Sequence, residues 1–216
     1  MNLEFARSQM LRQQIRAWEV LDDRVLATLG ATPREDFVPT DYSDAAFADL
    51  EIPLPHEQHM MSPRVEGRLL QSLQINPVER VLEIGTGSGF LTACLAGLAD
   101  TVVSVDVFAD FIDAAGPKLE RLAISNVELR AADGLTLDYE GEFDAIAVTG
   151  SVPELDDHFI RMLRPGGRLF VVTGREPVME AQLITLHAYG NWTRQSLFET
   201  LLTPLVNADT PPTFVL

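Results

Sequence analysis

The chain has 216 residues, 46% of them hydrophobic, which suffices for the core of one domain with an appended segment. Its 32 acidic and 16 basic residues give a formal net charge of −16 at pH 7, which repels phosphate backbones and anionic membrane surfaces, so we expect neither nucleic acid nor a membrane as a partner. The sequence has neither an apolar run of about eighteen residues nor a signal-peptide pattern at its N-terminus, and we therefore expect a cytoplasmic protein.

The first sixty residues are predicted to form helices joined by loops. Apolar residues at helical spacing predict a helix over residues 3–18. A second helix is predicted over residues 22–29, with Asp22 as its N-terminal cap and Gly30 as its stop. Residues 52–56 contain two prolines, each of which restricts the residue before it to extended backbone, so this stretch is predicted to be extended.

The chain is expected to divide at residue 62. Residues 1–62 would pack as a helical and loop segment on a domain formed by residues 63–216. In this domain, helical and extended patterns alternate and end in a hairpin, which predicts an α/β fold: a Rossmann-like, doubly wound, mostly parallel sheet with an antiparallel C-terminal edge. Gly116 and Pro117 are expected to break one of the helices. Strands are predicted over residues 81–84, 101–106, 126–134, 143–150, 168–174, 181–187 and 192–198, and helices over residues 62–76, 90–98, 108–122 and 153–163.

A glycine-rich turn joins the first predicted strand to the helix that follows it. Gly85, Gly87 and Gly89 have the spacing G-x-G-x-G, which differs from the G-x-G-x-x-G of dinucleotide-binding turns. Unpaired N–H groups at the start of the helix face the turn and favour a ligand there. Glu83 precedes the glycines, and Asp106 closes the next strand, where it could hold two ribose hydroxyls. An acid ahead of the turn suits a cationic ligand such as S-adenosylmethionine better than a pyrophosphate, because like charges would meet.

Other candidate ligand-binding residues also follow predicted strands. Because the carboxyl ends of parallel strands meet at one edge of a sheet, the glycine turn, Asp106, Asp133 and Thr149 are expected at a common site. The sequence leaves structural alternatives open, since Glu83 could cap the amides of the turn, Asp133 could form an Asp-Gly turn and Thr149 could simply end its strand. The single cysteine, Cys94, excludes an internal disulfide and is expected in the core, and the scattered histidines predict no metal site.

The chain carries five segments in this order: Glu83–Gly89, Val103–Asp106, Ala132–Gly134, Phe143–Ile146 and Leu163–Leu169. They resemble the successive motifs of class I S-adenosylmethionine-dependent methyltransferases. Over nearly its whole length, the chain is more narrowly similar to the protein-L-isoaspartate O-methyltransferase family. The segments that carry this narrower resemblance are residues 13–16, 23–26, 33–39, 52–54 and 148–153.

The resemblance implies an enzyme of protein repair. Its cofactor would be S-adenosyl-L-methionine, and its partner an isoaspartyl-containing peptide or protein that is methylated on the α-carboxyl of the damaged residue. Ser62 matches the active-site serine of the family, and Glu83 lies in the first motif beside the cofactor. Gly85, Thr86, Gly87 and Gly89 would line the methionine end of the cofactor, Asp106 with Val107 its ribose, Asp133 with Gly134 its adenine, and Thr149 with Gly150 the point of methyl transfer.

The chain departs from the family in the segment before Ser62. Where the family reads Gly-Gln-Thr-Ile-Ser, this chain reads Glu57-Gln58-His59-Met60-Met61-Ser62. The loss of the glycine and the threonine changes the shape and polarity of the loop beside the acceptor site. The C-terminus also differs, because a tail to Leu216 follows Leu202-Thr203-Pro204-Leu205. The acceptor therefore stays open between an isoaspartyl peptide and another carboxylic acid.

Methyl transfer to a carboxylate needs little acid–base help, since the acceptor is already an anion. The enzyme mainly aligns the reacting atoms and excludes water. Ser62 could orient the acceptor by a hydrogen bond, or cap the helix that begins at Pro63, and Met60 and Met61 could line an acceptor pocket or fill the core. A cofactor-binding protein without turnover is an alternative function, whereas the glycine spacing and Glu83 disfavour a nicotinamide oxidoreductase. The sequence is silent on the oligomeric state.

Overall fold

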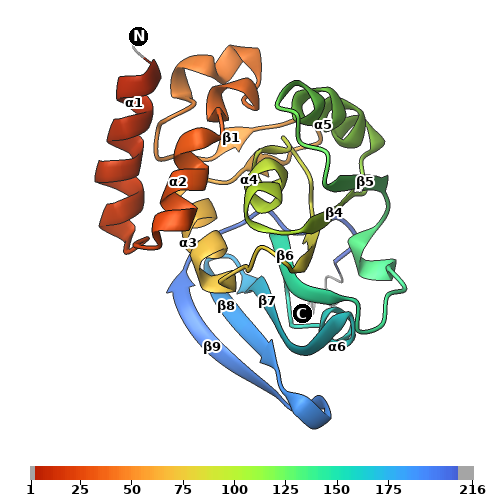
Figure 1. The fold of residues 1–216 in the computed structure, drawn as a ribbon. Helices are drawn as coiled ribbons and strands as arrows, with labels where there is room; N and C mark the ends of the chain where they lie inside the picture. Colours follow the sequence, from red (N-terminus) through yellow and green to blue (C-terminus); the bar gives the residue numbers. More distant parts are fainter. Residues whose placement is uncertain (1–2, 209–216) are drawn as a thin grey trace, which may run out of the picture.

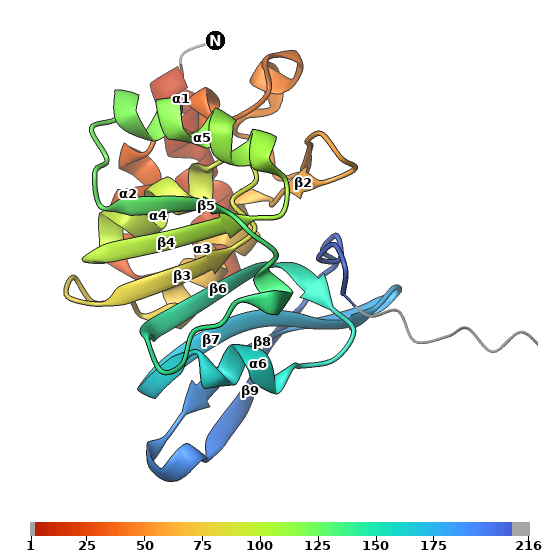
Figure 2. The same cartoon turned by 90° about the vertical axis from the view of Figure 1, so that its right-hand side faces the viewer.

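The computed structural model describes residues 3–208 and has a seven-stranded sheet at its centre (Figure 1). The strands lie in the order β5-β4-β3-β6-β7-β8-β9, as Figure 2 shows. The first five of these strands pair in parallel, whereas β8 is antiparallel to both β7 and β9. The predicted fold class is therefore confirmed. The strands are β3 (Arg80–Ile84), β4 (Thr101–Asp106), β5 (Val127–Ala131), β6 (Phe143–Val152), β7 (Leu163–Arg175), β8 (Val178–Leu186) and β9 (Trp192–Glu199).

Alternate residues of the central strands enter two hydrophobic cores, one on each face of the sheet. In β3, Val81 belongs to one core and Leu82 to the other. The core that contains Val81 also holds Cys94, whose side chain is fully buried, and burial raises the pKa of its thiol. Burial on both faces explains why these strands read as continuous apolar runs. The helices beyond residue 62 are α3 (Pro63–Leu73), α4 (Phe90–Leu98), α5 (Ala109–Arg121) and α6 (Asp157–Arg161).

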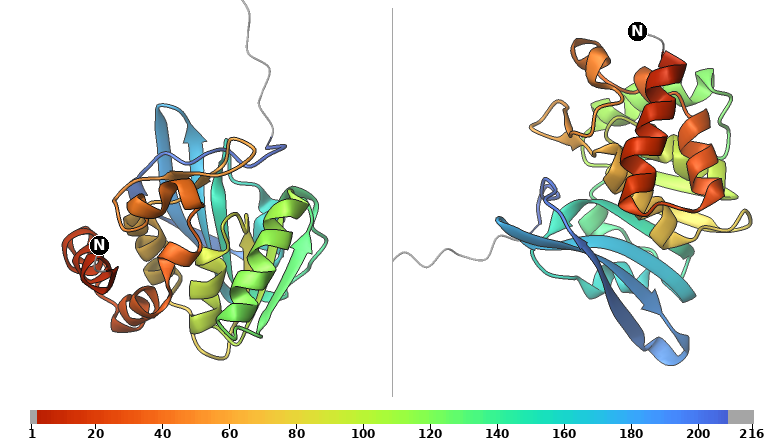
Figure 3. Two further views of the ribbon diagram at one scale, coloured as in Figure 1. Left: turned by 90° about the horizontal axis from the view of Figure 1, so that it is seen from above. Right: turned by 90° about the vertical axis from the view of Figure 1, so that its left-hand side faces the viewer.

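The N-terminal segment packs on the core that contains Val81. The helix predicted over residues 3–18 is formed as three consecutive pieces, namely α1 (Leu3–Gln9), the π-helical η1 (Met10–Ile15) and the 3-10 helix η2 (Arg16–Trp18). Ile15 and Val81 belong to one buried cluster. Figure 3 shows α1 beside α2 (Asp23–Ala31) on the outside of the molecule. The division of the chain at residue 62 stays a prediction.

Short elements connect this segment to the sheet. They are the 3-10 helices η3 (Arg34–Asp36) and η4 (Thr40–Ala45), and a two-stranded antiparallel ribbon of β1 (Ile52–Pro53) and β2 (His59–Met60). Asp22 caps α2 as predicted, because its carboxylate accepts hydrogen bonds from the backbone N–H groups of Arg24 and Val25. The ribbon brings residues 59–61 toward the ends of the parallel strands, next to the start of α3.

Three local predictions in the helices and loops are wrong. α2 runs through Gly30 to Ala31, and the glycine serves packing, since a Cβ there would lie 3.2 Å from Leu11 Cδ1. α5 continues through Pro117 without the expected break, because a helix tolerates the loss of one backbone hydrogen bond when its apolar face is packed. His56 is not extended but has a φ of 59°, so the extended stretch stops at the preceding proline.

The C-terminal third also differs in part from its prediction. The helix expected over residues 153–163 is reduced to α6, and Leu163 already belongs to β7. Residues 164–167, which separate the predicted helix from the strand predicted over 168–174, lie within β7 beside a register shift against β6. The predicted hairpin of β8 and β9 is confirmed, with the 3-10 turn η6 (Ala188–Gly190) between the strands, and it projects from the molecule in Figure 1.

Candidate active site

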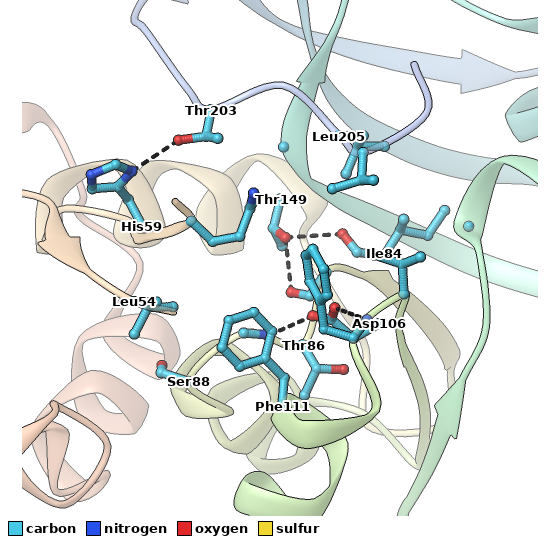
Figure 4. A pocket seen from close by; sticks show the side chains of 18 of the residues that line it. Leu54, His59, Ile84, Thr86, Ser88, Asp106, Phe111, Thr149, Thr203 and Leu205 are labelled. Atoms are coloured by element: carbon cyan, nitrogen blue, oxygen red, sulfur yellow. Dashed lines mark hydrogen bonds between the residues drawn. The ribbon is translucent and has the colours of Figure 1, made fainter. Parts of the chain in front are cut away.

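A pocket lies where the parallel strands end (Figure 4). It encloses about 910 Å³ of space not filled by atoms, with open solvent at its mouth included. The glycine loop after β3, the end of β4, the turn after β5 and the end of β6 all contribute to it, as the sequence predicted. Its lining comprises Glu51, Leu54, Gln58–Met61, Glu66, Ile84–Ser88, Leu91, Val105–Phe108, Phe111, Ala132–Gly134, Thr149, Gly150, Leu202, Thr203, Leu205 and Val206.

The glycine loop has a backbone that only glycine adopts easily. Gly85 has a φ of 102°, and a Cβ there would lie 2.1 Å from Thr149 Oγ1. Gly85, Thr86 and Gly87, which the resemblance assigns to the methionine end of the donor, all line the pocket. Gly89 does not line the pocket. It is the N-cap residue of α4, and its missing side chain lets the loop approach Ala115 of α5.

Asp106 joins the glycine loop to the start of α5. Its Oδ2 accepts a hydrogen bond of 2.9 Å from Gly87 N, and its Oδ1 accepts one of 3.0 Å from Phe108 N. The carboxylate is 6% exposed and lines the pocket, and burial raises its pKa. Val107, its neighbour in the predicted set, lines the pocket as well. A ligand held by the loop would therefore meet this carboxylate.

Glu83 is fully buried and does not line the pocket, and its role as a cofactor-binding residue stays a prediction. Its side chain points between the sheet and α4, where Oε2 accepts hydrogen bonds from the hydroxyls of Ser104 (2.6 Å) and Thr92 (2.5 Å). Ser104 in turn contacts the hydroxyl of Thr86 at 2.6 Å. Burial raises the pKa of Glu83 to about 8. Glu83 therefore supports the glycine loop from beneath, through Ser104 and Thr86, instead of capping its amides.

Asp133, Gly134 and Thr149 line the pocket at its other strand ends. Asp133 also forms the predicted turn, because its Oδ1 accepts a hydrogen bond from Leu135 N at 2.9 Å. Thr149 Oγ1 lies 2.9 Å from the carbonyl oxygen of Ile84 and 2.8 Å from that of Gly85, drawn as dashed lines in Figure 4. Asp133 and Thr149 can therefore shape the local backbone and still face a ligand in the pocket.

Ser62 is the N-cap residue of α3, but its hydroxyl makes no capping hydrogen bond. The side chain is 4% exposed and does not line the pocket, whereas Met60 and Met61 just before it do. Both methionines also belong to the hydrophobic core, so they line the pocket and fill the core at the same time, whereas an acceptor beside them stays a prediction. The Ser62 hydroxyl is therefore not used for capping and lies next to two residues of the pocket wall.

A C-terminal segment that the motifs did not assign to the site covers one side of the pocket. Leu202, Thr203 and Leu205 line it, and Thr203 lies across from His59 in Figure 4. Thr203 Oγ1 and His59 Nδ1 are 3.1 Å apart. Ser151 of β6 holds the segment, donating its N–H to the Thr203 carbonyl at 3.0 Å and accepting from Leu205 N at 2.9 Å.

Glu66 is a second lining residue that motif matching missed. It is 1% exposed and forms an ion pair with Arg34, which is fully buried. Burial raises the pKa of Glu66 to about 7, although Arg34 lowers it. The spacing could have revealed it, because Leu69, Leu70 and Leu73 follow at helical intervals, and a glutamate on the apolar face of a helix is unusual.

Two further observations concern metals and membranes. Over residues 3–208, no group of three or more His, Cys, Asp and Glu side chains is arranged to hold a metal ion. Within the same residues, no helix combines the length and the hydropathy that a membrane span requires. His56, which the sequence places near His59, pairs instead with Asp110 at 2.8 Å and stacks on Phe108.

Comparison with known proteins identifies the family. A family model described as protein-L-isoaspartate(D-aspartate) O-methyltransferase matches residues 6–210. The protein-L-isoaspartate O-methyltransferase of Koribacter versatilis (strain Ellin345) is 32% identical over 201 residues, which cover 93% of this chain and 90% of the relative. The enzyme of the same name from Methanoculleus marisnigri (strain ATCC 35101 / DSM 1498 / JR1) is 39% identical over 170 residues, which cover 78% of this chain and 77% of the relative.

Solved structures show the same fold. A Plasmodium falciparum chain in complex with S-adenosyl-L-homocysteine, described as a protein-L-isoaspartate O-methyltransferase, matches with a TM-score of 0.78 at 20% identity, covering 95% of this chain and 98% of that one. Another protein-L-isoaspartate O-methyltransferase structure matches with a TM-score of 0.77 at 23% identity, and the match covers 92% of this chain and 65% of that one. The family match over residues 6–210 shows that this chain belongs to the protein-L-isoaspartate(D-aspartate) O-methyltransferase family, whose methyl donor is S-adenosyl-L-methionine.

Proposed function

We propose that this chain methylates the free α-carboxylate of L-isoaspartyl residues in damaged proteins, and that it does so in the pocket at the strand ends. The observation that carries the proposal is the family match over residues 6–210. Most of the residues that would hold the donor also line one pocket. When bound, the donor supplies an electrophilic methyl group on a positively charged sulfur. The residues of the chain bind, align and shield the two reactants.

The charge of the pocket suits a cationic donor. Among the described residues that line it, four are acidic and none is lysine or arginine. The buried carboxylate of Asp106 lies beside the glycine loop, where it would accept hydrogen bonds from ribose hydroxyls. Asp133 and Gly134, which line the same pocket, would contact the adenine. Thr149 fixes the end of β6 to the loop and so shapes the point of methyl transfer. The four acids are Glu51, Glu66, Asp106 and Asp133.

The acceptor would enter between β2 and the C-terminal segment. Ser62 stands at the start of α3, where backbone N–H groups and the helix dipole favour an anion such as the acceptor carboxylate. Its hydroxyl would orient that carboxylate by a hydrogen bond and would not act as a covalent nucleophile. Met60, Met61 and Leu202 exclude water from the reacting atoms.

A transfer assay tests the proposed activity. The protein is incubated with donor labelled with tritium in its methyl group, and with an L-isoaspartyl peptide or the matching aspartyl peptide. We expect base-labile methyl ester on the isoaspartyl peptide well above the aspartyl control. Ester formation at the level of the control, by protein that binds S-adenosyl-L-homocysteine, would contradict this acceptor and leave the cofactor standing.

The loop before Ser62 favours one other acceptor class. Met60 and Met61 line the pocket in place of the more polar segment that the family has there, so a small apolar carboxylic acid would fit the same wall. A panel of such acids, assayed with the same labelled donor, separates the two acceptors. Binding of the donor with no product from any acceptor would instead favour a paralogue without turnover.

A further inference from the structure

The pocket wall contains a glutamate carboxylate with one oxygen that has no hydrogen-bond partner among the described residues. Glu66 is 1% exposed and lines the pocket together with the glycine loop. Its Oε2 is bound by Arg34, whereas none of the hydrogen bonds found over residues 3–208 includes Oε1. The second carboxylate oxygen is therefore free to accept a hydrogen bond from a ligand inside the pocket.

Arg34 holds Glu66 in place and is itself fully committed. Its Nε donates to the Ala46 carbonyl at 2.9 Å, and its Nη2 donates to the Met61 carbonyl at 2.7 Å. The guanidinium also lies over the Phe90 ring, 4.7 Å from the ring centroid. With these contacts on different sides, Arg34 cannot turn into the pocket and neutralise a second anion. The acid on the pocket wall is therefore Glu66, with its charge supported from behind.

Glu66 lies at the end of the pocket where the glycine loop passes into α4. Phe90, on which Arg34 stacks, is the first residue of α4, and the charge of Glu66 raises the pKa of Glu83 and of Cys94, which lies on α4. The charged groups that act on Asp106 are instead Asp110 and His56. Glu66 and Asp106 are thus two separate acidic points of the same pocket.

The donor carries a group that matches this position. Its methionine end, expected beside the glycine loop, bears an ammonium and a carboxylate, and the backbone N–H groups at the loop suit the carboxylate. An acceptor carboxylate would be repelled by Glu66, whereas an ammonium would be attracted and would donate to Oε1. We propose that Glu66, held by Arg34, binds the α-ammonium of S-adenosyl-L-methionine and so fixes the methionine end of the donor.

The test removes the carboxylate of Glu66 from the protein and, separately, the amino-acid end from the ligand. Dissociation constants are measured by calorimetry for Glu66→Gln and for the unaltered chain, with S-adenosyl-L-homocysteine and with 5′-methylthioadenosine, which lacks the amino-acid end. We expect the substitution to weaken binding of the first ligand by about tenfold or more, and binding of the second by less than about twofold. Glu51→Gln removes another acid from the pocket wall and should leave the ratio of the two constants unchanged.

Several results would overturn the proposal. Equal weakening of both ligands would mean that Glu66 only supports the wall, and unchanged binding of S-adenosyl-L-homocysteine would mean that it makes no contact. If the glutamine variant does not fold, Glu66→Asp is used, which keeps the charge on a shorter side chain. It must weaken binding of S-adenosyl-L-homocysteine more than binding of 5′-methylthioadenosine, although by less than the glutamine variant would. These measurements use no acceptor, so a wrong assignment of the isoaspartyl substrate would not affect them.

Discussion

The two halves of the pocket are built in different ways. The half proposed for the donor consists of strand ends and the turns that directly follow them, residues 84–88, 106–107, 133–134 and 149–150. They are tied together by hydrogen bonds such as that from Gly87 N to Asp106. The half proposed for the acceptor consists of segments far apart in the chain, residues 51–61 and 202–206, joined by the contact of His59 with Thr203. The donor half is therefore fixed by the sheet, whereas the acceptor half depends on loops that can change independently of it.

The largest effect is expected from a side chain in the glycine loop. Gly85→Ala would place a Cβ on Thr149 Oγ1 at a φ of 102°. This displaces the loop and breaks the hydrogen bonds from Thr149 to the carbonyls of Ile84 and Gly85. We expect binding of S-adenosyl-L-homocysteine to weaken by a factor of roughly one hundred or more, measured by calorimetry. Gly166→Ala is the matched control, because Gly166 also has a positive φ but nothing lies within 4 Å of its added Cβ. Similar binding losses in both variants would show that strain, not the pocket, explains the effect.

The second prediction concerns the end of β4. Asp106→Asn replaces one carboxylate oxygen by an NH₂ group, which cannot accept hydrogen bonds from both Gly87 N and Phe108 N. Binding of S-adenosyl-L-homocysteine should weaken by roughly ten- to one-hundredfold, in a titration at neutral pH. Asp110→Asn, four residues on and exposed, should change it little. A larger effect at position 110 than at 106 would contradict the assignment of the donor half.

The support beneath the loop should appear as a dependence of stability on pH. Burial raises the pKa of Glu83 from 4.5 to about 8, so the folded chain holds a proton that the unfolded chain has lost between these values. The raised pKa of Glu83 therefore reduces the free energy of unfolding as the pH rises from about 5 to 8. Glu83→Gln lacks the titrating group, and its stability relative to the unaltered chain should rise by on the order of 2 kcal/mol over this window, measured by denaturant unfolding. A constant difference between the two proteins would show that Glu83 is ionised at both pH values.

The smallest effect is expected in the acceptor half. Thr203→Val removes the hydroxyl that contacts His59 Nδ1 but keeps the shape of the side chain. The KM for the isoaspartyl peptide should rise a few-fold, while the dissociation constant of S-adenosyl-L-homocysteine stays the same, because the segment lies on the acceptor side. Thr193→Val, which removes a comparable contact of a threonine with His187 on the projecting hairpin, should change neither quantity. An equal effect on both ligands would mean that the two halves are coupled.

The difference between a donor half formed by strand ends and an acceptor half formed by distant loops also explains what the sequence could predict. Gly85, Asp106, Asp133 and Thr149 each follow an apolar strand directly, so local patterns and the rule that parallel strands end together were sufficient to bring them to one site. The mostly parallel sheet and its C-terminal hairpin were predicted from the alternation of helical and extended patterns. Glu83 matched its motif, but the alternation of side chains along β3 turns it away from the pocket, and the pattern of glycines alone does not reveal this.

Other features depend on contacts that no local pattern contains. The segment 202–206 reaches the pocket only because Ser151 of β6 binds it, and Glu66 could be recognised only by asking why an acid lies on the apolar face of α3. Pro117 and Gly30 have strong local preferences, yet the packing of their helices overrides them. The tail beyond residue 208, whose contacts the sequence left open, lies outside the described residues.

The buried thiol of Cys94 has a practical consequence for experiments on this chain. The single cysteine is fully enclosed by the packing of α4, and burial holds its pKa above the ordinary value, so maleimide reagents should not modify it in the folded protein. A cysteine placed on the exposed hairpin, for instance Tyr189→Cys, would then be the single site of labelling without prior removal of the native one. A fluorophore attached there would report encounters with acceptor proteins while the interior stays unaltered.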